Sequence, residues 1–99
     1  MPPLLALVDS GADVSAFHVS VAQQLGVDLD SFRTTTVGGV GGSLTAYACE
    51  VDLEIEDQRF SAEVRFVPMP IALLGRHDVF ARFLFAFDQR AQELLVEPY

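Results

Sequence analysis

The chain is short of cysteines, cations and long apolar runs, and each shortage excludes a class of protein. Cys49 is its only cysteine, so no disulfide forms within the chain. Six Lys and Arg face fourteen Asp and Glu, for a formal net charge of −8. Nucleic-acid binding needs clustered cations that displace counterions, so we expect no nucleic-acid partner. No run approaches the ~20 apolar residues of a transmembrane helix, so we expect no membrane span.

Apolar residues, in contrast, make up 51% of the 99 positions. This length fits one domain, residues 1–99. A lone chain of this size buries roughly 65% of its unfolded surface, so pairing of two copies would add stability. The start, Met1-Pro2-Pro3, lacks the basic residues of a signal peptide. The sequence leaves the compartment open and slightly favours the cytoplasm.

Short strands dominate the pattern, which predicts an all-β domain with two short helices. Residues 50–56 and 59–66 alternate polar, mostly charged, side chains with apolar ones around a tight turn. This pattern predicts a hairpin whose Glu and Arg side chains pair across the strands. Further strands are expected at residues 4–8, buried on both faces, and at residues 14–17, 33–37, 71–74, 84–87 and 93–96. Helices are expected at residues 21–25, capped by Ser20, and at residues 76–83, with Val79, Phe80 and Phe83 inward.

Three motifs carry the candidate chemistry. The first is the apolar strand that ends in Asp9-Ser10-Gly11-Ala12-Asp13. The second is the glycine-rich stretch at residues 38–42, and the third is the apolar segment Ile71-Ala72-Leu73-Leu74 that leads into Gly75-Arg76. An isolated Asp-Ser-Gly is a weak motif, so the three indicate a function only when taken together.

In this order and spacing the motifs resemble the retropepsins, a family of aspartic proteases, over about residues 4–83. The resemblance implies a closed β-barrel-like fold with a flap hairpin that functions as a homodimer. Only eight residues precede Asp9, and a longer connection with a predicted helix follows it; both features are more similar to cellular members than to viral ones. We therefore expect the dimer to be held mainly by the C-terminal hairpin, residues 84–96, rather than by an N-terminal strand.

The resemblance implies an aspartic endopeptidase that hydrolyses extended polypeptides with an activated water and needs no metal or cofactor. Asp9 is then the catalytic carboxylate. Aspartic proteases as a class use two carboxylates that share one proton, and the resemblance carries this arrangement over to the chain. The chain has a single Asp-Ser-Gly, so the second carboxylate must be Asp9 of another copy.

The resemblance also assigns roles to the neighbouring residues. Ser10 should brace the two loops across the dimer, and Gly11 should let substrate backbone approach. Asp13 should accept a bidentate hydrogen bond from Arg76 in a largely buried pair. The flap and substrate-binding residues implied are Ala12, Val37, Gly38, Gly39, Val40, Gly41, Gly42, Ile71 and Leu73.

Other interpretations of these residues remain open. The Asp-Ser-Gly triplet also fits an ordinary turn. Ser10 and His18 could act as a nucleophile and its base, and Arg76 could be a solvated residue at the start of a helix. The glycines fit a phosphate loop poorly, because position 44 is leucine and a strand follows. His18, His77, Asp78 and Cys49 lack the spacing of a known metal site. The main alternative function is a peptide-binding or dimerisation module without turnover.

Overall fold

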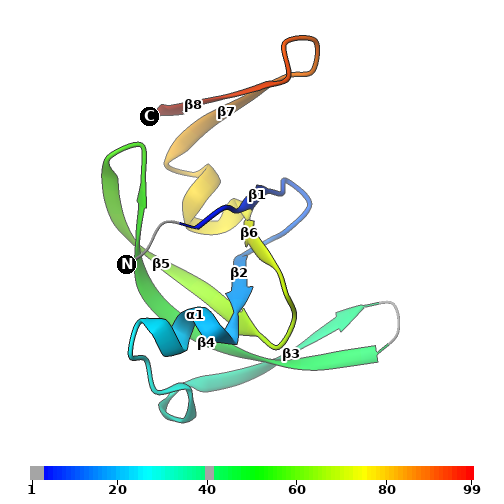
Figure 1. Ribbon diagram of the computed structural model, residues 1–99, viewed down its shortest axis with the longest axis vertical. Coiled ribbons are helices and arrows are strands. Elements are labelled where there is room, and N and C mark those ends of the chain that lie inside the picture. Colours follow the sequence, from blue (N-terminus) through cyan, green and yellow to red (C-terminus); the bar gives the residue numbers. More distant parts are fainter. Residues whose placement is uncertain (1–3, 40–41) are drawn as a thin grey trace.

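A mixed six-stranded sheet and a separate two-stranded hairpin form most of the protein. The computed structural model describes residues 4–39 and 42–99. In the six-stranded sheet the strand order is β1-β6-β2-β5-β4-β3, and β7 pairs with β8 (Figure 1). The strands are β1 (Leu7–Val8), β2 (Ser15–His18), β3 (Arg33–Gly39), β4 (Gly42–Ile55), β5 (Gln58–Val67), β6 (Ala72–Leu74), β7 (Phe83–Asp88) and β8 (Glu93–Pro98). The helical elements are α1 (Val19–Gln24) and two shorter turns, η1 (Leu29–Ser31) and η2 (Arg76–Phe80).

The hairpin of β4 and β5 confirms the alternation seen in the sequence. Its turn is made by Glu56 and Asp57, which have φ of 50° and 63°. Two central residues with positive φ match the right-handed twist of the flanking strands. The apolar set Leu53, Phe60, Ala62, Val64 and Phe66 is buried, whereas the acidic side chains of β4 are exposed.

Strand pairing around β6 determines where the candidate site forms. β6 lies between β1, to which it is parallel, and β2, to which it is antiparallel. β2 in turn pairs in parallel with β5. The segment that follows β1 and the segment that follows β6 therefore lie side by side, although they are far apart in the sequence.

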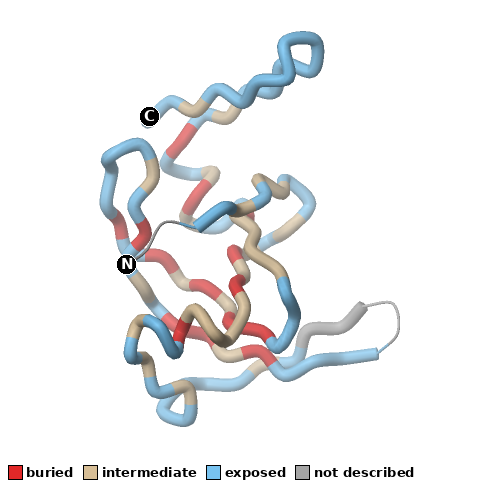
Figure 2. The backbone as a smooth tube through the Cα atoms, viewed as in Figure 1, coloured by how far each residue is buried: buried red, intermediate tan, exposed pale blue. Residues whose placement is uncertain are grey.

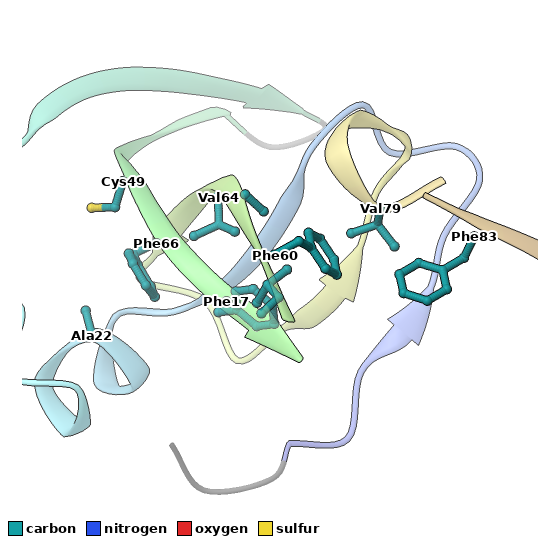
Figure 3. Close-up of a cluster of buried hydrophobic side chains, with 10 residues drawn as sticks. Phe17, Ala22, Cys49, Phe60, Val64, Phe66, Val79 and Phe83 are labelled. Atoms are coloured by element: carbon teal, nitrogen blue, oxygen red, sulfur yellow. The ribbon is translucent and has the colours of Figure 1, made fainter. Parts of the chain in front are cut away.

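The core is built from side chains of β2, α1, β4, β5, η2 and β7 (Figure 3). The tilted rings of Phe17 and Phe66 lie 6.5 Å apart between centroids, and those of Phe60 and Phe83 lie 5.7 Å apart, which are favourable aromatic distances. Cys49 is buried in this core, as expected for a small apolar side chain. Burial raises the pKa of the Cys49 thiol, and the nearby charge of Arg65 offsets part of that effect.

The predicted helices differ from those observed. α1 begins at Val19 rather than Val21, because His18 and not Ser20 is the N-cap: His18 Nδ1 accepts the Ser20 N–H at 3.1 Å. The predicted helix 76–83 is interrupted at His77 and Asp78, whose backbone angles are non-helical, and η2 ends at Phe80. Phe83 belongs to β7 instead. Val79 and Phe83 are buried, as predicted, and Phe80 is half-buried.

The first predicted strand is also shorter and less buried than expected. Only Leu7 and Val8 form strand, and Leu5 and Leu7 are 98% and 66% exposed. The reason is position: β1 is an edge strand that pairs with β6 alone. In the described residues β1 and β3 are the two ends of the sheet, so barrel closure stays a prediction.

The β7–β8 hairpin extends away from the rest of the molecule and is exposed along most of its length (Figure 2). Its base packs on the core through Phe83, Phe85 and Val96. Its far end presents Phe87 and Leu94 to solvent. None of the helices in the described part of the chain has the length and apolar character needed to cross a membrane.

Candidate active site

The loop at residues 9–13, called here the Asp9 loop, begins where β1 ends. The Asp9 N–H donates to Leu74 O at 3.0 Å, which extends the β1–β6 pairing by one residue. Ala12 N–H donates to Asp9 O at 3.1 Å and closes a tight turn. The turn directs Gly11 N–H to the Asp9 carboxylate, with a distance of 2.9 Å to Oδ1. Asp9 itself is half-buried.

Gly11 is suited to this turn because of its size. A Cβ added there would lie 3.2 Å from Asp9 Oδ1, which is closer than most real contacts of a Cβ atom. The missing side chain lets the Gly11 amide approach the carboxylate directly. The Asp9 carboxylate is thus oriented by its own loop before any substrate binds.

The segment after β6 holds the other end of the Asp9 loop. Arg76 N–H donates to Ala12 O at 2.9 Å, and His77 N–H donates to Asp13 O at 2.7 Å. The side chains of Arg76 and Asp13 also contact each other as an ion pair. The first and third sequence motifs are therefore in direct contact.

The Asp13–Arg76 pair differs from the expectation in two ways. One guanidinium nitrogen contacts one carboxylate oxygen, so the contact is not bidentate. The Asp13 and Arg76 side chains are 83% and 58% exposed in the single chain, so the pair is not largely buried. An exposed pair contributes about 0–1 kcal/mol to stability, since both charges stay solvated.

Two further residues fix this region, and the sequence analysis did not assign them a role. Gly75 is buried, and a Cβ there would lie 2.5 Å from the carbonyl carbon and oxygen of Val14. Gly75 N–H donates at 3.0 Å to the hydroxyl of Ser15, which is only 1% exposed. A serine at an inward position of a strand was the available signal, because a buried hydroxyl needs a partner.

The remaining predicted site residues lie around this loop or in the β3–β4 hairpin. Ser10 is exposed, and Ala12, Ile71 and Leu73 are half-buried. Val37, Gly38 and Gly39 belong to β3, and Gly42 starts β4. The backbone pairs Val37 with Leu44 and Gly39 with Gly42, so β3 and β4 are paired as far as these two glycines. Val40 and Gly41 lie outside the described residues.

The alternative chemistries find little support in this arrangement. His18 Nδ1 contacts Ser20 Oγ at 2.8 Å and caps α1, so it is occupied away from Ser10. Within residues 4–39 and 42–99, no three His, Cys, Asp or Glu side chains gather as metal ligands would. What the geometry presents is a carboxylate on a loop braced from both sides.

A comparison with models of known protein families supports the aspartic-protease interpretation of the fold and the Asp9 loop. Residues 2–77 match the family model described as aspartyl protease, so the chain belongs to the aspartyl protease family. A search of curated proteins finds no significant match.

Two solved structures show the same retropepsin-like fold. A retropepsin-like aspartic protease from Rickettsia conorii has a TM-score of 0.70 and 28% identity, covering 90% of this chain and 75% of that one. EIAV protease complexed with the inhibitor HBY-793 has a TM-score of 0.62 and 27% identity, covering 75% of this chain and 71% of that one. The mostly β architecture with two short helices is thus a retropepsin-like fold, as the motifs predicted.

Proposed function

We propose that this chain is an aspartic endopeptidase whose active site contains Asp9 from each of two copies. The observation that carries the proposal is the Asp9 loop: a half-buried carboxylate follows a sheet strand and receives the Gly11 N–H. Hydrogen bonds from Asp9 to β6 and from η2 to Ala12 and Asp13 hold the loop at both ends. Such preorganisation is what a reacting group requires, because little has to move when substrate arrives.

The chemistry needs two carboxylates. When two are held close together they share one proton, since both cannot ionise comfortably. The ionised member takes a proton from water, and the protonated member donates to the carbonyl oxygen of the scissile peptide. One proton must stay on the pair, so the rate should fall as the pH rises into the alkaline range. The chain supplies one Asp-Ser-Gly, and a two-fold axis through the loops would supply the second.

Exposed apolar side chains support pairing of two copies. Phe87 and Leu94 at the far end of the β7–β8 hairpin are 63% and 41% exposed and lie opposite each other in the hairpin. They would be buried if two hairpins packed together in a symmetric, self-complementary interface. In such a dimer the β3–β4 hairpin would act as a flap over an extended peptide, with Ala12, Ile71 and Leu73 lining side-chain pockets.

Substitution of the carboxylate tests the proposal. Asp9→Asn keeps the size of the side chain and an acceptor for the Gly11 N–H, so the fold and association should persist. Peptide hydrolysis should disappear, because neither copy then holds an ionisable group at this position. Cleavage of a diverse peptide mixture is measured at several pH values, with and without a pepstatin-type inhibitor.

Two results would contradict the proposal. One is hydrolysis by Asp9→Asn protein at the wild-type rate. The other is wild-type protein that dimerises and binds peptides but never cleaves them, which would identify a peptide-binding module on the same fold.

A further inference from the structure

We propose that Asp78 is a positioning residue for Asp9, acting by tying the segment that supports the Asp9 loop to the central strand β5. The inference rests on the proposed function in one respect: it takes Asp9 to be the catalytic carboxylate. Its structural part concerns a single contact, the Asp78–Glu63 contact, in which Glu63 N–H donates to Asp78 Oδ2 at 2.9 Å.

The backbone of Asp78 is unusual. Asp78 has φ 67° and ψ −35°, and the preceding His77 is extended at φ −67° and ψ 132°. A residue with a side chain rarely adopts positive φ, and such a conformation persists when the surroundings impose it. Here the surroundings include β5: the Asp78 side chain is only 27% exposed, and its carboxylate receives a backbone amide. The conformation of η2 is thus set by a tertiary contact and not by helix propensity.

The Glu63 N–H explains why a hydrogen-bond acceptor is needed beside β5. β2 pairs with β5 from Val64 onward, so its pairing begins one residue after Glu63. The Asp78 carboxylate supplies an acceptor to Glu63 N–H at the point where β2 does not. A half-buried amide without an acceptor would cost stability, so the contact anchors η2 to a fixed position on the sheet.

That anchor is adjacent to the bonds that support the Asp9 loop. Arg76 and His77, the two residues before Asp78, donate their N–H groups to Ala12 O and Asp13 O. If Asp78 moves, these two donors move with it and the loop loses support on its C-terminal side. Misplacement of a reacting group by about 1 Å can lower a rate by about 10²-fold. Asp78 therefore acts through the loop and does not itself need to touch substrate.

An alternative role for this region is ligand binding. An open hollow of about 670 Å³ lies here, and the groups that line it include Asp13, Glu63, Arg65, Arg76 and Asp78. Its charged groups already pair with one another: Arg76 with Asp13, Arg65 with Glu63, and Asp78 with the Glu63 amide. A charged ligand would have to displace these partners, so the arrangement favours support of the loop over recognition of a ligand.

Three variants separate the carboxylate from the backbone conformation. Asp78→Gly accommodates positive φ but removes the acceptor. Asp78→Asn keeps an acceptor oxygen and tolerates positive φ, so it should restore whatever Asp78→Gly loses. Asp57→Gly is the matched control, since Asp57 also has positive φ but lies in the exposed β4–β5 turn.

The first measurement is amide hydrogen exchange, which does not depend on activity. In Asp78→Gly the amides of Glu63, Arg76 and His77 should exchange at least about tenfold faster, because local opening no longer breaks a tertiary bond. The amide resonance of Gly11, which donates to Asp9 Oδ1, should shift as well. Asp78→Asn and Asp57→Gly should match the wild-type protein at all four amides.

The second measurement is the kinetics of peptide cleavage. Asp78→Gly should lower kcat by roughly 10–100-fold with a much smaller change in KM, since the loop is misplaced while other substrate contacts remain. Asp78→Asn should recover most of the rate. The inference would be overturned if Asp78→Gly kept the wild-type exchange rates and kcat. It would also be overturned if Asp57→Gly lowered kcat as much as Asp78→Gly, or if Asp78→Asn did not restore kcat. If the wild-type protein cleaves nothing, the proposed function fails, and the exchange and Gly11 data still decide whether Asp78 positions Asp9.

Discussion

Gly75 shows how much depends on one missing side chain. Its position lets β6 end against the backbone of Val14, while its amide reaches the buried Ser15 hydroxyl. These contacts join the segment after β6 to the segment after β1. The Asp9 loop can therefore form only where two distant parts of the chain approach closely.

Gly75→Ala should disrupt this approach. Its Cβ would lie 2.5 Å from backbone atoms, which cannot rotate away as a side chain could. We expect a loss of about 3 kcal/mol in the free energy of unfolding, the upper part of the usual range for overpacking, together with loss of peptidase activity. Chemical denaturation and a peptide-cleavage assay measure the two effects.

Gly26→Ala is the matched control for this substitution. Gly26 has φ of 73° and open space around its Cα, so an added Cβ meets strain but no clash. It should cost about 1–2 kcal/mol and leave activity intact. Equal stability of Gly75→Ala and the wild-type protein would show that the backbones do not approach as described.

Cys49 gives a prediction for the pH dependence of stability. Its pKa is raised by burial in the folded protein, whereas in the unfolded chain the thiol ionises near pH 8.5. The unfolded chain therefore loses this proton first. The stability that depends on it is fully present below about pH 8.5 and is lost as the pH rises toward the raised value, by up to about 1.4 kcal/mol per pH unit.

Comparison with Cys49→Ala isolates this effect. The variant lacks the thiol, so its stability should fall less between pH 7 and pH 10, although its stability at pH 7 is lower because of the smaller side chain. Free energies of unfolding at several pH values give the slope of stability against pH for the wild-type protein and for Cys49→Ala. Parallel slopes for the two proteins would mean that the thiol pKa is the same in the folded and unfolded states.

At the scale of elements, the β7–β8 hairpin leaves large apolar side chains exposed in a single chain. Phe83, Phe85 and Val96 bury its base in the core, but Phe87 and Leu94 extend beyond it. Phe87→Asn should leave the unfolding free energy of the single chain within about 0.5 kcal/mol, as is usual for exposed positions. Self-association should weaken, because the substitution removes apolar area from the proposed interface.

Sedimentation over a range of concentrations measures this prediction. Phe32→Asn carries the same substitution on a different exposed phenylalanine, between η1 and β3, and should associate like the wild-type protein. If Phe87→Asn protein associates as strongly as the wild-type and Phe32→Asn proteins, the two copies meet through another surface.

The elements also show what sequence reasoning could and could not reach. Period-two alternation located β5 and the second half of β4, because side-chain alternation is a local property of a strand. The Asp9 loop and Arg76 were found through motifs, and these residues contact each other, although the Asp13–Arg76 pair is neither bidentate nor largely buried. The sequence did not reveal the placement of β6 between β1 and β2, since pairing of distant strands depends on the whole fold.

The other predictions that the structure corrects were wrong for similar physical reasons. The start of α1 was set by the imidazole of His18, an uncommon cap, in place of the usual hydroxyl of Ser20. The kink inside η2 lies at His77 and Asp78, where the tertiary Asp78–Glu63 contact forms, and no local pattern encodes such a contact. The Asp13 and Arg76 side chains are exposed in the single chain, and a local sequence pattern does not show what surrounds a side chain in the fold.

At the scale of the whole molecule, the proposed chemistry requires two copies. The chain has one Asp-Ser-Gly, and its described residues form a sheet with two edge strands and an exposed apolar hairpin. The molecule is elongated, with dimensions of 41 × 31 × 21 Å, and two hairpins extend from it (Figure 1). Association through a two-fold axis would bring two Asp9 loops together and cover apolar surface at the same time.

Mixing of subunits tests the requirement for two Asp9 residues most directly. Wild-type protein and Asp9→Asn protein are combined at a fixed total concentration, allowed to exchange subunits, and assayed for peptide cleavage. If each active site needs Asp9 from both chains and the copies pair at random, an equal mixture should keep about one quarter of the wild-type activity. If the mixture keeps about one half, as expected when every chain works alone, each chain has a complete active site and the requirement for two copies is wrong.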